Sequence, residues 1–438
     1  HEETTETTLI FERLVSNVPF RRLLEIAGIS ADRLYRWIEF LADQCRLFSA
    51  HRERRLHRAF AGRNRVVATD VQTILVNWRH AERILNVPIL HAVTSERSSG
   101  FIIAATTDYD EEVDPADAEQ EFIMSGDFML PRAWRENART WTLREFEDSI
   151  FRGASRLLAP EEKKIKNYHD LPGNGSHIRS DIFQIAHLMH VNKLIGNDFR
   201  QLLICVDGDL GLAKIGSVLF AQHVLAGRAH IADVRFSKDL GNRKREEKVL
   251  EGEQNLESDQ SLLGPLIATA RNAYKLESDI TPVIAARLLR AYGASTVDAR
   301  MRGLAETGFR WRYHRKEEPG KNIFLMTDLG HLSFGDLATL LTTASMARTD
   351  KYLALIRRRV SGFQRGTRSN ASKQTVWHAT AFCNAAMVER LAVIFRYYQN
   401  FMLPEGEQSG KPKGERQAPA MKLGIAKEKV YVRDLLRF

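Results

Sequence analysis

The sequence predicts a mixed α/β protein, in which a helical N-terminal region precedes a sheet-containing core and a long helical segment interrupts that core. Three observations predict this fold class. The first 50 residues have the apolar spacing of helices, residues 66–106 are rich in β-branched residues, and residues 243–362 return to helical patterning. At 438 residues the chain is long enough for about two to four domains.

The N-terminal region is predicted to contain two helices joined by a short turn. Residues 20–27 are amphipathic, Gly28 suits a left-handed helix C-terminus, and Ser30 suits the N-cap of the following helix. Two helices joined by a short glycine-containing turn form the helix-turn-helix pattern. In that interpretation Arg33 and Arg36 face a DNA groove. An ordinary helical hairpin is the alternative.

Strands and helices then follow one another in a recognisable order. We expect strands over 66–76, 87–94 and 100–106, a helix over 181–194, a buried strand over 199–207 and a helix over 214–225. Three antiparallel strands, a helix, a strand and a helix is the order of the ribonuclease-H-like fold. The fold class is therefore predicted as a ribonuclease-H-like mixed sheet with an N-terminal helix-turn-helix and a mostly helical insertion.

The later segments complete the predicted domain organisation. A hairpin is expected within 309–326, a long helix over 382–402, and a Gly-, Pro- and charge-rich linker over 404–419. The predicted parts are a helix-turn-helix region (1–60), the first part of the core (61–242), a mostly helical insertion (243–362), the second part of the core (363–403), and a linker with a C-terminal tail (404–438).

The charge balance favours a polyanionic partner. The formal net charge is +9 and the isoelectric point is near 9.4, which favours nucleic acid. The basic residues gather in clusters beside the predicted DNA-binding and catalytic segments. Those expected to contact DNA are Arg33, Arg36, Arg52, Arg54, Arg55, Arg58, Arg357, Arg358, Arg359, Arg365, Arg368, Lys373 and Arg396.

Two aspartates are predicted to meet at one edge of the sheet. Asp70 lies within an apolar β-rich run, and Asp207 closes a second apolar strand. A carboxylate in such a run must be paired, bind a metal, or emerge at the edge of the sheet. Carboxylates from adjacent strand ends suit Mg²⁺, and two such ions can stabilise the attacking and leaving oxygens of phosphoryl transfer. Asp209 is the alternative to Asp207.

A third acid is expected on a helix that packs near the same edge. Glu389 is the candidate, because it lies off the buried stripe of its helix, on a face shared with Arg396 and Asn400. The alternative is that Glu389 faces solvent and that the third acid lies in the insertion, for example at Asp328 or Asp336.

Several short motifs resemble those of DDE transposases of prokaryotic insertion sequences. Residues 206–215 resemble the D-G-D-x-x-L-x-x-A-I segment of Mutator-like and related transposases, in which the first Asp is the second catalytic acid. Residues 384–390 resemble the N-x-x-x-x-E-R helix of the third acid, 398–400 the Tyr-Asn element after it, and 418–424 the T-P-A-x-x-L-G signature with Ala for Thr. The Cys and His that follow the second acid in Mutator-like enzymes are missing. The resemblance spans residues 17–106, 180–240 and 363–425.

The resemblance implies a transposase that binds the terminal repeats of a mobile element and catalyses DNA cleavage and strand transfer. Asp70, Asp207 and Glu389 would be catalytic and would hold two Mg²⁺ ions, with Mn²⁺ as a substitute. The expected partners are double-stranded DNA and further copies of the chain, in a homodimer or higher oligomer. The alternatives are a non-catalytic DNA-binding relative of a transposase, and a ribonuclease-H-fold nuclease without strand transfer.

The expected compartment is the cytoplasm, in association with the nucleoid. Cys45, Cys205 and Cys383 are too few and too widely spaced for a disulfide framework or a Cys-x-x-Cys zinc site, which suits a reducing compartment. No stretch approaches the ~18–20 apolar residues of a membrane helix, so no membrane partner is expected.

Overall fold

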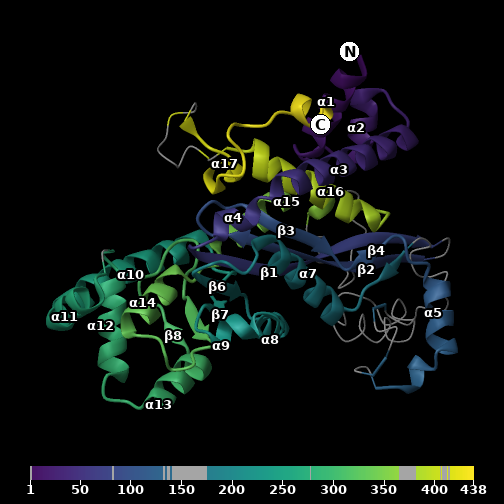
Figure 1. Ribbon diagram of the computed structural model, residues 1–438. Coiled ribbons are helices and arrows are strands. Elements are labelled where there is room, and N and C mark those ends of the chain that lie inside the picture. Colours follow the sequence, from purple (N-terminus) through teal and green to yellow (C-terminus); the bar gives the residue numbers. More distant parts are fainter. Residues whose placement is uncertain are drawn as a thin grey trace.

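A seven-stranded mixed sheet runs through the middle of the computed structural model, with helices on both faces (Figure 1). The structure describes residues 2–80, 83–131, 134–135, 139–140, 175–276, 278–364, 381–404, 406, 412 and 415–438. Among these, no helix is long and apolar enough to cross a membrane.

The predicted three-strand meander is confirmed. Strands β1 (Asn64–His80), β2 (Arg83–Glu96) and β3 (Ile102–Thr107) pair antiparallel in succession. The buried strand after residue 199 is β6 (Gln201–Val206), which pairs parallel with β1, and β7 (Ala229–Arg235) pairs parallel with β6. Strand β7 is not among the predicted strands.

The predicted hairpin within residues 309–326 is also present, but the sequence did not indicate that it extends the main sheet. Strands β8 (Phe309–Arg310) and β9 (Asn322–Leu325) pair antiparallel, and β9 pairs with β7. The complete order is β3-β2-β1-β6-β7-β9-β8. The insertion thus extends the sheet as well as adding helices. A separate two-stranded sheet joins β4 (Tyr109–Asp110) and β5 (Ser176–His177).

Hydrogen bonds show which helix covers which face of the main sheet. In β2, Thr94 Oγ1 lies 2.7 Å from His187 Nε2 in α7 (Ser180–Ile195). The next residue, Ser95, places its Oγ 2.7 Å from Thr349 Oγ1 in α15 (Ala347–Arg359). Because successive strand residues point to opposite faces, α7 and α15 cover opposite sides of the sheet. Helix α8 (Leu210–Leu219) packs against β6 and β7, next to α7.

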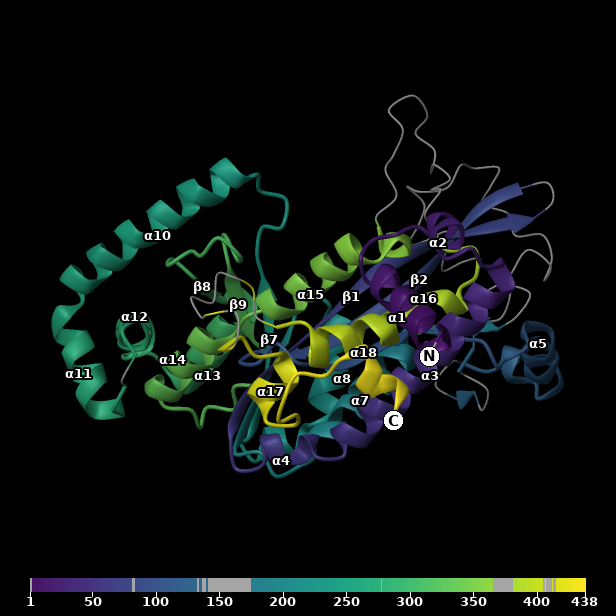
Figure 2. The same cartoon turned by 90° about the horizontal axis from the view of Figure 1, so that it is seen from above.

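The insertion forms a mostly helical block beside β7. It contains α10 (Asn242–Leu262), α11 (Gly264–Tyr274), α12 (Thr281–Tyr292), α13 (Val297–Arg302) and α14 (Phe334–Thr343). Figure 2 shows α10 and α11 as an outer arc of this block. Helix α15 follows it directly, yet it packs across β1 and β2. The sequence placed α15 inside the insertion, whereas its contacts belong to the sheet.

The N-terminal helix pair forms as predicted. Helix α1 (Glu2–Leu14) precedes α2 (Phe20–Ala27), which ends at Gly28 with φ 63°, and the Ser30 side chain accepts a hydrogen bond from the Arg33 N–H at the start of α3 (Ala31–Glu53). Helix α3 runs farther than the expected residue 47, and α4 (Leu56–Phe60) follows it.

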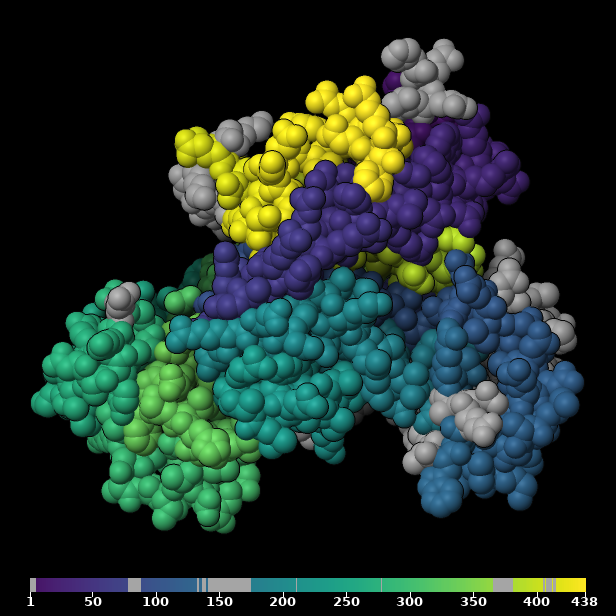
Figure 3. Space-filling model, in the orientation of Figure 1, coloured from purple at the N-terminus to yellow at the C-terminus, as the bar shows by residue number. Residues whose placement is uncertain are grey.

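The C-terminal segment packs beside the N-terminal helices, as Figure 3 shows in yellow and purple. The predicted long helix is α16 (Ala386–Tyr397), continued by a π-helical turn (Tyr398–Met402), and α17 (Pro419–Leu423) and α18 (Val432–Leu436) follow. The Phe438 ring lies 5.2 Å from that of Phe48 in α3. Of the described α-helices two remain: α5 (Pro115–Met124) follows β4, and α9 (Ala221–Leu225) follows α8 and contacts β7.

Candidate functional site

The pairing of β1 with β6 brings Asp70 and Asp207 to one edge of the sheet. Thr69 pairs with Val206 at the end of the parallel register, so the next residue on each strand is an aspartate. Side chains alternate along β1, and Asp70 therefore faces the same side as Ala68, whose carbonyl accepts a hydrogen bond from Thr349 of α15. The two aspartates thus lie beneath the start of α15.

Lys238 connects these two aspartates to a third, Asp350. Its Nζ lies 3.2 Å from Asp70 Oδ2 and 3.2 Å from Asp350 Oδ1, and it also forms an ion pair with Asp207. Asp350 belongs to the first turn of α15, and Lys238 follows β7. We call Asp70, Asp207 and Asp350 the acid cluster. Its members come from the middle of β1, the end of β6 and the first turn of α15, and all three contact one positive charge.

The turn after β6 is built to present Asp207. Gly208 has φ 63°, a conformation that favours glycine, and its N–H donates to Asp233 Oδ1 at 2.7 Å. Asp233 is buried on β7 and forms an ion pair with Arg235 at 2.7 Å. Asp209 caps α8 by accepting from the N–H groups of residues 211 and 212. Asp209, the alternative to Asp207, therefore has a structural partner of its own.

Burial is the main cause that raises the pKa of Asp70 and of Asp350. Burial raises the pKa of Asp350 to about 6; Lys238 opposes the shift and Asp70 adds to it. Burial also raises the pKa of Asp70, again against Lys238. For Lys238 burial alone would lower the pKa, but Asp70, Asp207 and Asp350 together raise it. The lysine is therefore charged at neutral pH and lies among three carboxyl groups.

The raised pKa of Asp350 predicts a stability that falls with pH in metal-free buffer. A carboxyl group with a folded pKa of about 6 stabilises the protein below about pH 4, and this contribution is lost as pH rises through 6. Asp350→Asn should therefore increase the free energy of unfolding at pH 7.5 by on the order of 1–3 kcal/mol. Urea unfolding in EDTA at pH 4.5 and 7.5 tests this. A gap between variant and wild type that is equal at both pH values would contradict it.

A groove of about 1420 Å³ opens over the acid cluster. Segments far apart in sequence line it, because it lies where the strand ends, α15 and the β8–β9 loop meet. Its basic lining residues are Arg97, Lys238, Arg245, Arg315, Arg348, Lys351 and Arg357. Besides the acid cluster, Asp239, Glu317 and Glu318 also line the groove. Basic groups beside a cluster of carboxylates suit a polyanion that approaches a metal ion.

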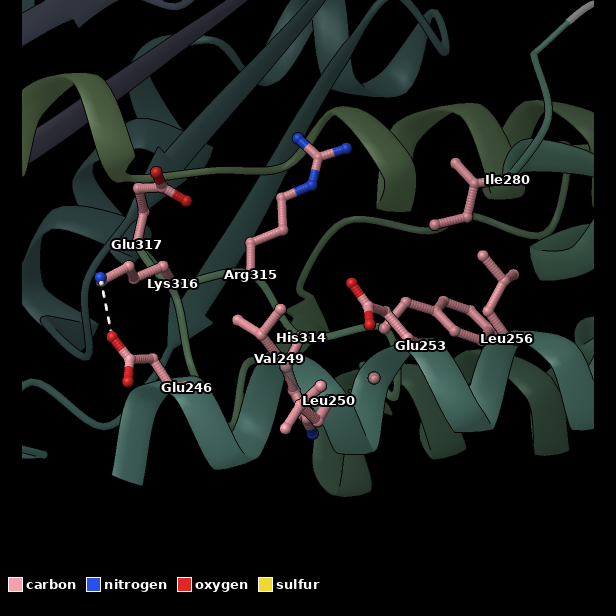
Figure 4. Close-up of a pocket in the computed structure, with 12 residues that line it drawn as sticks. Glu246, Val249, Leu250, Glu253, Leu256, Ile280, His314, Arg315, Lys316 and Glu317 are labelled. Carbon is pink, nitrogen blue, oxygen red and sulfur yellow. Dashed lines mark hydrogen bonds and ion pairs between the residues drawn. The ribbon is translucent and has the colours of Figure 1, made fainter. Parts of the chain in front are cut away.

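A second cavity, of about 680 Å³, lies between α10 and the loop that precedes β9 (Figure 4). Val249, Leu250 and Leu256 of α10 form part of its apolar wall. Arg315 and Glu317 line both this cavity and the groove, so the two share one loop.

Glu389 does not join the acid cluster. Its Oε1 accepts from Arg46 of α3 at 3.0 Å. Its helix, α16, lies along the outer edge of β3, where Asn400 bonds both the N–H and the carbonyl of Ile102. Helix α16 packs beside α15, since the Phe395 and Tyr352 rings lie 5.6 Å apart, but it borders β3, which is three positions from β6 in the sheet. Asp350 of α15 takes the place that the sequence assigned to Glu389.

The other two candidates for the third acid have structural partners. Asp328 is buried, lies 3.4 Å from Arg300 Nε, and accepts from the N–H of Gly330. Asp336 forms a capping box with Ser333 at the start of α14. These contacts explain both carboxylates without a metal.

The predicted DNA-contacting residues fall into several groups. Arg36, Arg54, Arg55, Arg58 and Arg358 are exposed, while Arg52 and Arg359 are partly buried. Arg33 is exposed and forms an ion pair with Glu6 at 2.6 Å. Arg357 lines the groove and donates to Gln72 Oε1. Arg365, Arg368 and Lys373 lie outside the described residues.

Arg396 is the exception among these predicted contacts. Its side chain is only 13% exposed, forms an ion pair with Glu53, and donates to the carbonyls of Ile102 and Ile103. It fastens α16 to α3 and to the edge of β3. A DNA contact for Arg396 does not fit this burial.

Sequence reasoning missed Asp350 and Lys238. Asp350 stands in the first turn of a helix, where an acidic residue is favoured by the helix dipole, so its pattern alone is unremarkable. The available signal was the order of elements along the chain: α15, of 13 residues, follows the shorter helix α14 and is the last α-helix before residue 363, where the second part of the core was predicted to begin. Lys238 follows a strand, β7, that was itself not predicted.

Comparison of the sequence with models of known protein families and with curated proteins finds no match. Across the described ranges, no three His, Cys, Asp or Glu side chains are grouped in the geometry of a metal site. In the acid cluster the position between the carboxylates is taken by the Lys238 ammonium.

Proposed function

We propose that this protein is a DDE-type transposase in which Asp350 supplies the third acid, so that the catalytic set is Asp70, Asp207 and Asp350. One observation carries the proposal: three carboxylates, from β1, the end of β6 and the start of α15, contact the same cation. The reaction would be metal-dependent cleavage of double-stranded DNA followed by strand transfer.

The sheet topology supports a ribonuclease-H-like core. A three-strand antiparallel meander is followed by two parallel strands added beside β1, in the order β3-β2-β1-β6-β7. Helix α15 then returns across β1 and β2 after the insertion. In this topology the acids from β1, β6 and α15 converge although 280 residues separate the first from the last.

The donor set fits Mg²⁺ if Lys238 moves. All three groups are carboxylates, the oxygen ligands that Mg²⁺ prefers. Asp350 Oδ2 is buried and has no hydrogen-bond partner among the residues that the structure describes, so it offers an acceptor beside Oδ1, which meets Lys238. Asp70, Asp207 and Asp350 would hold the metal, which would supply charge stabilisation at the reacting phosphate and activation of the attacking oxygen.

The groove residues would bind and orient the DNA backbone. Arg348 and Lys351 extend from α15 next to Asp350, and Arg97 and Arg357 also line the groove. Their positive charges attract phosphates, with an affinity that falls as salt rises. Arg245 donates to the carbonyl of Lys238 at 2.7 Å and so fixes the backbone of the loop that carries the lysine. The side chain of Lys238 remains able to leave the cluster for a phosphate.

The test is cleavage and joining of duplex DNA by the purified full chain. The terminal repeat is unknown. The substrate is therefore a library of duplex fragments from the genome that encodes the chain, incubated with a supercoiled plasmid. We expect nicking and insertion with Mg²⁺ or Mn²⁺ and neither in EDTA, since the acid cluster needs a divalent ion to hold the phosphate. Sequencing of plasmid junctions gives the readout. Nicking without junctions would favour a nuclease without strand transfer.

A non-catalytic DNA-binding relative is the second candidate. The observation that favours it is the position of Lys238, whose ammonium already neutralises part of the acid cluster. For that candidate we expect no nicking with either metal in the same assay. We also expect salt-sensitive DNA binding in a filter-binding assay and no Mn²⁺ binding in titration calorimetry.

A further inference from the structure

A buried ion pair lies directly behind the first turn of α15. Glu318 and Lys321 lie three residues apart in the loop between β8 and β9, and both are almost fully buried. Lys321 Nζ lies 2.9 Å from Glu318 Oε2 and donates to the carbonyl of Ala344 at 3.0 Å. The pair thus contacts the chain just ahead of α15.

Glu318 holds the residues from which α15 begins. Its Oε1 accepts from Ser345 Oγ at 2.8 Å and from the N–H of Met346 at 2.6 Å. The Met346 carbonyl in turn accepts from the N–H of Asp350 at 3.0 Å. One residue, Met346, therefore links the buried carboxylate to the backbone of Asp350.

The same helical turn is fastened from the opposite side by the sheet. Thr349 Oγ1 donates to the carbonyl of Ala68 at 2.9 Å and lies 2.7 Å from Ser95 Oγ. Thr349 thus ties this turn to β1 and β2, whereas Glu318 ties the two residues that precede α15 to the β8–β9 loop.

We propose that Glu318, held by Lys321, is a positioning residue that sets the carboxylate of Asp350 within the acid cluster. This rests on the proposed function, because the cluster is taken as the metal site. The insertion then has a defined task, since its β8–β9 loop determines where the third acid stands. The loop also lines the groove through Arg315 and Glu317, so DNA in the groove would contact the element that positions Asp350.

The experiment compares two variants that differ in one hydrogen-bond acceptor. Both carry Lys321→Met, so that no buried lysine is left unpaired. One adds Glu318→Gln, whose amide oxygen still accepts from Met346, and the other adds Glu318→Met, which has similar size and no such acceptor. Replacing a buried ion pair by neutral groups of similar volume is often tolerated, so both chains should fold.

Mn²⁺ affinity, measured by titration calorimetry on the full chain without DNA, is the main readout. We expect the Glu318→Met chain to bind Mn²⁺ at least about tenfold more weakly than the Glu318→Gln chain. The difference should vanish when both also carry Asp350→Asn, because Glu318 acts through Asp350. A difference that persists in the Asp350→Asn background, or equal affinities in its absence, would overturn the proposal.

The control is a surface ion pair on the same loop. Lys316 Nζ lies 3.4 Å from Glu246 Oε1 of α10, and Figure 4 shows the pair at the edge of the second cavity. Lys316→Met should leave Mn²⁺ affinity within about twofold of wild type, because both side chains are exposed. A loss as large as that of the Glu318→Met chain would mean that any damage to the loop weakens metal binding, and would overturn the specific role of Glu318.

Hydrogen exchange separates this proposal from the proposed function. If the wild-type chain binds no Mn²⁺, the metal site fails, but Glu318 can still be tested through the amides of residues 346–350. We expect these amides to exchange at least about tenfold faster in the Glu318→Met chain than in the Glu318→Gln chain. Equal exchange rates would overturn the positioning role whether or not a metal binds.

Discussion

Asp350→Asn should reduce Mg²⁺-dependent DNA cleavage by about 1,000-fold or more, while Glu389→Gln should leave it near wild type. The reason is position. Asp350 meets Asp70 and Asp207 at Lys238, whereas Glu389 is paired with Arg46 beyond β3. Loss of a metal ligand removes several kcal/mol of charge stabilisation in the transition state, and each 1.36 kcal/mol is tenfold in rate.

The two variants are matched, since each replaces one carboxylate by an amide of the same shape. Single-turnover cleavage of a nicked or pre-cleaved duplex measures both, and filter binding in EDTA confirms that DNA affinity survives. If Glu389→Gln abolishes cleavage and Asp350→Asn does not, the acid cluster described here is not the catalytic site. Loss in both would mean that α16 moves to the strand ends when DNA binds.

Lys238→Met should strengthen Mn²⁺ binding by about tenfold or more and destabilise the metal-free chain. The ammonium competes with a divalent ion for three carboxylates, so its removal frees the position between them. Without metal, those carboxylates lose their counter-charge. Because the Lys238 side chain is 41% exposed, solvent reduces the cost to about 1–2 kcal/mol. Added Mn²⁺ should then raise the melting temperature more in the variant than in wild type.

Lys351→Met is the control for this variant, because it removes the same charge from the same groove. Lys351 lines the groove on α15 but is not among the partners of the acid cluster. Its loss should change Mn²⁺ affinity by less than about threefold. Weaker Mn²⁺ binding by Lys238→Met would show that the lysine supports the metal site instead of competing with it.

The pair Asp70–Asp207 could be predicted from sequence because each aspartate belongs to an apolar β-rich segment, Asp70 within β1 and Asp207 directly after β6. Once β1 and β6 pair in parallel, with Thr69 opposite Val206, the two aspartates are neighbours, so their proximity follows from local pattern and one pairing. The N-terminal helix pair was predictable for a similar reason: Gly28 and Ser30 carry local backbone signals.

The place of Asp350 beside this pair could not be predicted in this way, because the apolar pattern of a helix does not specify which strand the helix covers. Helices α15 and α16 are both amphipathic, and both contain an acidic residue in the first turn. What distinguishes them is tertiary: Thr349 bonds Ala68 of β1, while Asn400 bonds Ile102 of β3. Apolar spacing likewise does not specify that α15, which follows the insertion in sequence, packs across β1 and β2.

Strand β9 protects the edge of β7 from edge-to-edge aggregation. Six of the seven residues of β7 are buried, and its outer edge would present unpaired backbone groups if β7 ended the sheet. Such an edge recruits strands from other molecules. The insertion supplies a four-residue partner in β9 and then a two-residue strand, β8, which is too short to serve as a template. Removing β8 and β9 would therefore expose the edge of β7 and make the chain more prone to aggregation.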